Sequence, residues 1–338
     1  MSGRPVPVFG RDAADVAWRP TPELRAESRL AGFLRLTGEP DLVGLQAHAA
    51  ADPAWFWGAA AADLGLAWRR PPTRILDASG GPEWARWWVG GELNYAEAAV
   101  DPRAARDPDG PAVAWEGEDG EVRRLTNGEL KAAVDRAAGM IAGLGIGRGD
   151  RVGIQLPFVL ETVIAVLAVG RLGAVYTPIF SGYGAPAAAG RLADCGARLL
   201  ITADGFLRRG SVVPLKRTAD AAVALAPTVE HVLVVRRLGD RLGEAVPWTP
   251  GRDRWWDEAI ADPAVVPLAE AAATSAEDPC LIIYTSGTTG RPKGAVHAHG
   301  GFPVKAAQDL AHQFDLRAGD RDRKSTRLNS SHVALSRM

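Results

Sequence analysis

The sequence predicts an α/β fold in which a mostly parallel sheet carries helices on both faces. Two observations support this prediction. Residues 152–178 read as a β-α-β unit made of strand Val152–Leu156, helix Phe158–Leu172 and strand Ala174–Pro178. The alternation then continues with helix Ala185–Cys195, strand Leu199–Thr202 and strand His231–Val235. Strands that are separated by helices favour parallel pairing with the helices packed on the sheet.

The segments before this unit predict an N-terminal arm, a helical region and a hairpin. The first forty residues are polar and contain several prolines, and Leu42–Leu66 has helical periodicity. Ala112–Trp115 and Val122–Leu125 have the pattern of two paired strands. Thr126-Asn-Gly-Glu129 has the form of a capping box, because the threonine hydroxyl and the glutamate carboxylate can each satisfy one free amide. The helix that it opens should end near Leu144, before a glycine-rich turn.

Composition excludes several classes of partner. The 338 residues are 47% hydrophobic and 23% charged, with a formal net charge of −1, and this length allows two domains with a sizeable core. A nucleic-acid or anionic-membrane partner would require a clustered basic face. No apolar segment of a signal peptide follows Met1, and Phe158–Leu172 is too short to span a bilayer. We therefore expect a cytoplasmic protein without membrane insertion.

Cysteine and histidine usage predicts no metal site in the chain. Cys195 and Cys280 lie in apolar segments and are expected to be small core residues in a reducing compartment. His297 and His299 alternate on a predicted strand, and a zinc site would need further partners.

The most informative segment is Tyr284-Thr-Ser-Gly-Thr-Thr-Gly-Arg-Pro-Lys-Gly294. It holds five hydroxyls, three glycines and one lysine in eleven residues, directly after the apolar run Leu281–Ile283. Hydroxyls and successive backbone amides can surround polyphosphate oxygens, and a lysine adds a mobile positive charge. The glycine spacing does not fit a Walker A loop, and the segment that follows alternates like a strand instead of opening a helix. We predict an ATP-phosphate loop; the alternative is a hairpin loop without a ligand.

The same segment resembles the phosphate loop of the adenylate-forming superfamily, which includes acyl-CoA synthetases, luciferases and peptide-synthetase adenylation domains. Five further segments resemble the acetyl-CoA synthetase branch, and they are Trp87–Asn94, Leu125–Leu130, Ile201–Asp204, Val213–Lys216 and Gly251–Trp256. The resemblance runs from about residue 40 to about residue 321. It implies the large N-terminal domain of that fold, without its C-terminal domain.

The resemblance implies domains, substrates and site residues. Residues 1–39 would be an arm, 40–100 an acetyl-CoA synthetase N-terminal-like extension, 101–321 the first part of the adenylation domain, and 322–338 a tail foreign to the family. The co-substrates would be ATP with Mg²⁺, a small carboxylic acid and CoA. The ATP phosphates would contact Thr285, Ser286, Gly287, Thr288, Thr289, Gly290 and Lys293. The family's catalytic lysine would lie beyond this chain.

Arg208 and Arg209 are candidate ligands of the CoA phosphates. In acetyl-CoA synthetases a basic segment with two arginines follows the Ile-Thr-Ala-Asp stretch. Arg208 matches the first of these arginines. The position of the second is occupied by Ser211, and Arg209 could take over its role. Guanidinium groups suit phosphate binding. The alternative is a solvated surface pair.

Three functions remain open from the sequence: an acyl-CoA synthetase of the acetyl-CoA branch acting on a short-chain acid, another adenylating enzyme such as a carrier-protein-loading domain, and a non-catalytic ATP-binding protein. The Trp-rich N-terminal extension argues against the second.

Arg323–Met338 contains three arginines, one lysine, four serines and no acid. We expect it to be an aberrant read-through segment, with a genuine basic tail as the alternative, and we expect the chain to be an incomplete enzyme that is inactive alone.

Overall fold

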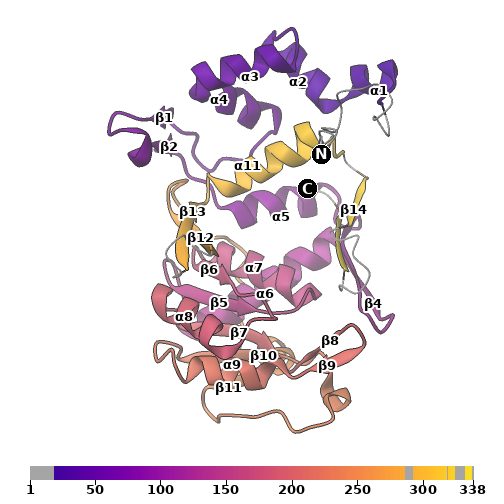
Figure 1. Cartoon of the computed structure of the whole chain (residues 1–338), viewed down its shortest axis with the longest axis vertical. Coiled ribbons are helices and arrows are strands. Elements are labelled where there is room, and N and C mark those ends of the chain that lie inside the picture. The colour runs from indigo at the N-terminus through magenta and orange to yellow at the C-terminus, as the bar shows by residue number, and fades with distance from the viewer. Residues whose placement is uncertain (1–18, 286–291, 318, 324–331, 337–338) are drawn as a thin grey trace, which may run out of the picture. The chain divides into compact units, whose positions relative to one another are not determined.

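The computed structural model describes residues 19–285, 292–317, 319–323 and 332–336 (Figure 1). These residues fall into two compact units. The small unit comprises Met1–Leu64 with Gln308–Leu316, and the large unit comprises Gly65–Ala307 with Arg317–Met338. The site residues predicted from the sequence all belong to the large unit.

The small unit is a helical bundle around Phe33, Leu45 and Ala60, which are all nearly fully buried. Side chains of Thr21, Ser28, Asp41 and Asp52 cap its helices by accepting a backbone N–H of the first turn. Its elements are α1 Pro22–Glu27, α2 Arg29–Thr37, α3 Leu42–Ala51, α4 Pro53–Asp63 and the π-helical η4 Asp309–Gln313. The helical prediction for 42–66 is confirmed, and residues 22–37, expected from the sequence as part of an arm, are also helical.

The large unit is built on a seven-stranded sheet of order β11-β10-β7-β5-β6-β12-β13. All neighbouring strands pair in parallel except β13, which returns antiparallel to β12. The strands are β5 Arg151–Gln155, β6 Val175–Pro178, β7 Leu199–Ala203, β10 His231–Val235, β11 Asp253–Trp255, β12 Pro279–Thr285 and β13 Lys293–Ala298. The predicted mostly parallel α/β sheet is therefore confirmed.

Helices cover both faces of this sheet because successive strand residues point to opposite sides. One face packs Leu199 and Ile201 with α6 and α7, and the other packs Leu200 with α8 and α9. The helices are α5 Tyr95–Arg106, α6 Asn127–Gly143, α7 Leu160–Arg171, α8 Ala185–Cys195, α9 Leu215–Val223, α10 Trp256–Ala261 and α11 Phe302–Gln308. The capping box of α6 is present as predicted, since Thr126 and Glu129 each accept the other's backbone N–H.

A second sheet and two ribbons complete the large unit. The second sheet has the order β14-β15-β3-β4, with β3 Pro111–Glu116 and β4 Val122–Thr126 forming the predicted hairpin. The ribbons pair β1 Arg74–Asp77 with β2 Arg86–Val89, and β8 Phe206–Arg208 with β9 Ser211–Val213. Short helical turns η2 Pro82–Trp84 and η3 Gly239–Leu242 lie in connecting segments.

The C-terminal segment forms strands that the sequence pattern did not predict. β14 Arg321–Arg323 pairs with β15 His332–Ser336, and β15 pairs antiparallel with β3. A ladder requires only backbone N–H and C=O groups, so a polar segment without apolar alternation can extend a sheet. The assignment of 322–338 as a tail foreign to the family stays a prediction.

Cys280 is buried and Cys195 is half-buried, and both are free thiols. No helix within the described ranges has the length and apolar character needed to cross a membrane.

Candidate functional site

The two residues that flank the predicted phosphate loop, Thr285 and Lys293, lie in the hairpin β12–β13. β12 runs parallel to β6, so Thr285 lies at the edge where the other parallel strands also end. Thr285 and Lys293 are direct partners in the last pair of the ladder. The structure therefore brings these two predicted residues together. Ligands of α/β sheets bind beyond this edge. The other predicted phosphate ligands, Ser286, Gly287, Thr288, Thr289 and Gly290, lie outside the described residues.

The side chains of the two predicted phosphate ligands that the structure describes are accessible. Thr285 and Lys293 are both exposed, and Lys293 forms no ion pair with any residue in the described ranges. A hydroxyl donor and an exposed ammonium group at the mouth of the hairpin suit phosphate oxygens, because both can donate hydrogen bonds to an anion.

Tyr284 does not contribute its hydroxyl to this mouth. The hydroxyl donates to the Asp194 carboxylate of α8 at 2.5 Å, and the Arg191 guanidinium lies 5.7 Å from the ring centroid. Burial, together with this hydrogen bond to a carboxylate, raises the pKa of Tyr284 above its ordinary value. The tyrosine thus anchors β12 to α8, and its own hydroxyl is engaged within the protein.

A continuous row of aromatic rings and guanidinium groups links this hairpin to the predicted CoA residue. The Arg191 guanidinium stacks over Tyr183 at 4.3 Å, Tyr183 meets Phe180 edge-to-face at 5.5 Å, and Arg208 lies over Phe180 at 5.7 Å. Together with Tyr284, these residues form what we call the aromatic row. Phe180 is 54% exposed. Phe180, Tyr183 and Arg191 were not predicted from the sequence, because no local pattern marks residues that meet only in space.

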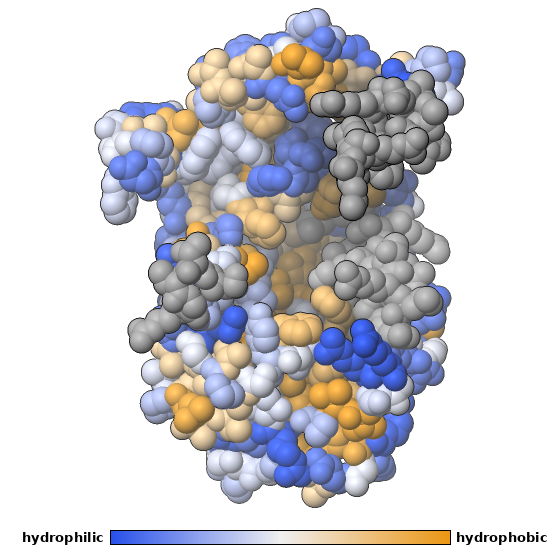
Figure 2. Space-filling model, in the orientation of Figure 1, coloured by the Kyte–Doolittle hydropathy of each residue, from blue (hydrophilic) through white to orange (hydrophobic). Residues whose placement is uncertain are grey.

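The predicted CoA-phosphate residues lie at the turn of the β8–β9 ribbon. Arg208 and Ser211 are paired, and the two residues between them, Arg209 and Gly210, both have positive φ angles of 53° and 74°. Two successive left-handed residues define a type I′ turn, which matches the twist of a two-stranded ribbon. Arg208 and Arg209 are exposed, and in Figure 2 the end of this ribbon lies in a strongly hydrophilic area. Their exposure agrees with either a phosphate site or a solvated pair.

A buried carboxylate organises the segment beside this ribbon. Asp204 is fully buried and accepts backbone N–H bonds from Gly205 (2.7 Å), Arg237 (2.9 Å), Leu238 (3.1 Å) and Gly239 (2.7 Å). These bonds satisfy amides that would otherwise be buried without a partner. The Ile-Thr-Ala-Asp motif therefore has a structural explanation, since its aspartate fixes the connection that follows β10.

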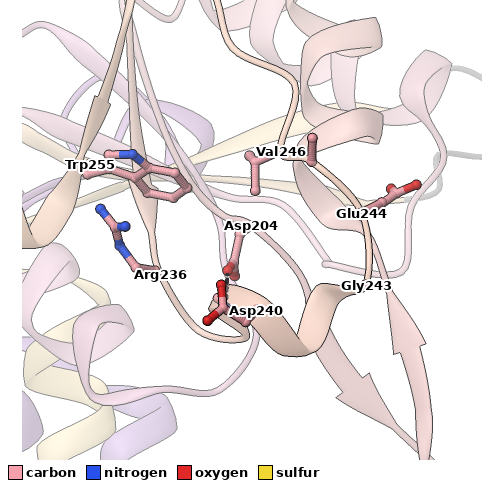
Figure 3. A pocket seen from close by; sticks show the side chains of 9 residues that line it. Asp204, Arg236, Asp240, Gly243, Glu244, Val246 and Trp255 are labelled. Atoms are coloured by element: carbon pink, nitrogen blue, oxygen red, sulfur yellow. Dashed lines mark hydrogen bonds between the residues drawn. The ribbon is translucent and has the colours of Figure 1, made fainter.

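A pocket of about 550 Å³ opens next to this connection (Figure 3). On one side the Arg236 guanidinium stacks over Trp255 at 4.2 Å and pairs with Glu258 at 2.7 Å. Asp204 lines the pocket but is saturated by amides, and Trp255 is also stacked against Trp248 at 4.7 Å. Asp204, Arg236 and Trp255 are thus already engaged in contacts within the protein. None of the residues predicted to bind ATP or CoA lines it.

Polar side chains are also buried where the chain changes direction across the sheet. The connection after β5 leads to β6 and the one after β7 leads to β10, on opposite sides. Gln155 and Thr202, at the ends of β5 and β7, are direct partners, and Thr177 of β6 is paired with Gly153. The side-chain polar atoms of these three residues are buried without a hydrogen-bond partner among the described residues. Such groups usually bind ordered water.

No group of three or more acidic, histidine or cysteine side chains within the described ranges could hold a metal ion.

Two family profiles match the chain. The profile of AMP-binding enzymes covers residues 100–334, and that of the acetyl-coenzyme A synthetase N-terminus covers residues 44–99. The first match therefore continues past residue 321, where the resemblance found in the sequence ends.

Curated relatives are named acetyl-coenzyme A synthetase. That of Gemmatimonas aurantiaca is 43% identical over 283 residues, and that of Mycobacterium tuberculosis is 45% identical over 258 residues. These alignments cover 82% and 75% of this chain, but only 42% and 38% of the relatives. Among solved structures, acetoacetyl-CoA synthetase from Streptomyces lividans matches with a TM-score of 0.79 and 27% identity, covering 90% of this chain and 46% of that one. The chain thus spans less than half the length of the proteins it matches.

Proposed function

Because the chain belongs to the AMP-binding enzyme family, we propose that it contributes to an ATP-dependent carboxylate–CoA ligase that works through an acyl-adenylate. The observation that carries this proposal is the pairing of Thr285 with Lys293 at the C-terminal edge of the sheet, where the hydroxyl- and glycine-rich segment between them emerges. The relatives' names and the match to the acetyl-coenzyme A synthetase N-terminus support a CoA-dependent reaction.

In the first step a carboxylate oxygen attacks the α-phosphorus of ATP, an acyl-adenylate forms, and pyrophosphate leaves. The hairpin's part is electrostatic: Thr285 donates to a phosphate oxygen, and Lys293 offsets the charge that builds up on the departing pyrophosphate. Mg²⁺ accompanying the nucleotide would supply further charge neutralisation. No general base is needed, because a carboxylic acid is already ionised at neutral pH.

In the second step the CoA sulfur attacks the acyl carbonyl carbon and the thiol proton is released to solvent. The bond from that carbon to the phosphate oxygen breaks, so a thioester forms and AMP leaves. We propose that Arg208, with Arg209 beside it, binds phosphates of CoA. The 54% exposed Phe180 ring, which lies under the Arg208 guanidinium, offers a face on which the adenine base of CoA can stack. This arrangement favours the phosphate site over a solvated pair, since it places a cation and an exposed ring where a nucleotide needs both.

The substrate acid and the compartment follow the relatives. We propose a short-chain acid, with acetate first, because the curated relatives are named for acetyl-CoA. We place the reaction in the cytoplasm, where ATP and CoA are supplied. A carrier-protein-loading enzyme is the second candidate, but the match of residues 44–99 to an acetyl-coenzyme A synthetase N-terminus supports the CoA ligase.

Carboxylate-dependent exchange between pyrophosphate and ATP tests this function. We would measure it with the 338-residue chain and with a chimaera that joins residues 1–321 to the remaining length of the Gemmatimonas aurantiaca relative. We expect acetate-dependent exchange and acetyl-CoA formation in the chimaera, and negligible acetyl-CoA formation by the isolated chain, which spans 42% of that relative.

The outcomes separate the candidate functions. A chimaera that activates acetate but transfers it only to a carrier protein would support the second candidate. A chimaera that folds and binds ATP but shows no exchange with any carboxylate would support a non-catalytic ATP-binding protein instead.

A further inference from the structure

The type I′ turn that carries Arg209 is held by a carboxylate from another part of the chain. The backbone N–H groups of Arg209 and Gly210 donate to the two carboxylate oxygens of Glu118, each at 3.2 Å. Glu118 belongs to the turn between β3 and β4, about ninety residues earlier in the sequence. Because Arg209 carries a Cβ and has a φ of 53°, its left-handed backbone is unfavourable without such support.

Glu118 is itself held in place by its neighbour. Asp119 accepts hydrogen bonds from the guanidinium groups of Arg237 at 2.9 Å and Arg241 at 2.5 Å. Partial burial opposes ionisation of Asp119, but these two arginines outweigh it and lower the pKa of Asp119 to about 2. The backbone of Arg237 is in turn fixed by Asp204. The β3–β4 turn is therefore clamped to the connection that follows β10.

The turn that bears Glu118 is packed too closely to move independently. A Cβ atom on Gly117 would lie 2.4 Å from the Asp119 carboxylate and 2.6 Å from the Arg237 guanidinium. The Arg237 guanidinium also stacks over Trp115 of β3 at 4.8 Å. The backbone that carries Glu118 is thus held in place, and its carboxylate accepts from the amides of the β8–β9 turn.

We propose that Glu118 is a positioning residue for CoA binding. It fixes the left-handed Arg209-Gly210 turn, and the fixed turn directs the adjacent Arg208 side chain over Phe180, toward the nucleotide end of CoA. The inference rests on the proposed function, which places CoA phosphates at Arg208.

The charge of Glu118 gives the proposal a clear alternative. A carboxylate close to a phosphate site repels the ligand, so a Glu118 without a positioning role would weaken CoA binding, and its removal would strengthen it. Replacement by alanine therefore has opposite effects under the two explanations. Glu118→Gln removes the charge but keeps an amide oxygen that can accept from the turn.

The first measurement is hydrogen–deuterium exchange of the 338-residue chain, read on the peptide that covers residues 206–214. Glu118→Ala should raise the exchange rates of the Arg209 and Gly210 amides about tenfold, and Glu118→Gln should raise them less. Glu116→Ala is the matched control, because Glu116 is exposed at the end of β3 and its carboxylate contacts no described residue. Unchanged exchange in Glu118→Ala would overturn the proposal.

The second measurement is the Kd for CoA, by equilibrium dialysis with labelled CoA, alongside the Kd for MgATP. Glu118→Ala should raise the Kd for CoA about tenfold and leave that for MgATP unchanged, and Glu118→Gln should recover most of the loss. Equal or tighter CoA binding by Glu118→Ala would contradict the proposal. If the unsubstituted chain binds no CoA, the assignment of Arg208 to CoA fails, and the exchange measurement still decides whether Glu118 holds the turn.

Discussion

His299, which follows β13, makes the stability of the large unit dependent on pH. Its side chain is fully buried; Nδ1 accepts the Tyr95 backbone N–H at 3.1 Å, and Nε2 has no partner among the described residues. Burial lowers the pKa of His299 to about 4, with Arg148 acting in the same direction and Asp278 opposing it. The folded protein therefore holds this imidazole neutral.

The size of the effect follows from the difference between the two states. In the unfolded chain a histidine takes up its proton below about pH 6.5, whereas in the folded protein His299 does so only near pH 4. The free energy of unfolding should therefore fall as the pH drops from 6.5 toward 4. A full shift of this size corresponds to about 3 kcal/mol, and about 2 kcal/mol should already be lost at about pH 5.

Urea unfolding at several pH values measures this loss. In His299→Asn the amide oxygen can still accept the Tyr95 backbone N–H, but the smaller side chain packs less well, so the variant should be less stable at pH 7. Because asparagine does not titrate, the variant should lose about 2 kcal/mol less of its free energy of unfolding between about pH 7 and 5. His297→Asn, on β13 two residues earlier, should keep the slope of the parent protein. Parallel pH profiles for the parent and His299→Asn would refute the reasoning.

Three further substitutions test other contacts. Asp204→Asn should lower the free energy of unfolding, measured in urea, by about 3 kcal/mol, because the amide NH2 group would face backbone N–H donors that the carboxylate now accepts. The control is Asp240→Asn, which lines the same pocket but is exposed and should change the free energy of unfolding by less than about 0.5 kcal/mol. Arg208→Ala should raise the KM for CoA about tenfold without changing pyrophosphate exchange in the chimaera, and an unchanged KM would make Arg208 a solvated residue. Arg209→Asn keeps a residue type that tolerates the left-handed turn, so any rise in the KM for CoA reports the lost guanidinium and not a disturbed backbone.

The regular elements of the large unit were predictable because their signals are local. The strands and helices predicted between 152 and 235 each show their own periodicity, and the capping box at Thr126 and Glu129 marks the start of α6 within four residues. The ribbon β8–β9 and helix α9, which lie in the same stretch, were not predicted. The polar C-terminal segment carries no such signal. Its strand β15 pairs with β3, which lies more than two hundred residues earlier in the sequence, and β14 pairs with β15.

The site was predictable only in part, for the same reason. The composition of Tyr284–Gly294 indicates phosphate chemistry without reference to any other segment. Two other contacts join residues that are far apart in the sequence, and only the fold brings them together. They are the hydrogen bonds from the β8–β9 turn to Glu118 and the stacking of Arg208 over Phe180. The engagement of Tyr284 by Asp194 likewise depends on how α8 packs beside β12.

The most direct test of the central claim compares the two half-reactions in the chimaera and in its Lys293→Ala variant. Lys293 lies opposite Thr285 at the mouth of the hairpin, so it should act on the departing pyrophosphate and not on thioester formation. We predict that Lys293→Ala slows acetate-dependent pyrophosphate exchange about 100-fold and has a much smaller effect on transfer from pre-made acetyl-adenylate to CoA. Lys131→Ala, which removes a lysine paired with Asp135 on α6, should leave both steps unchanged. Equal losses in the two half-reactions of Lys293→Ala, or no loss in either, would contradict the assignment of this hairpin to the ATP phosphates.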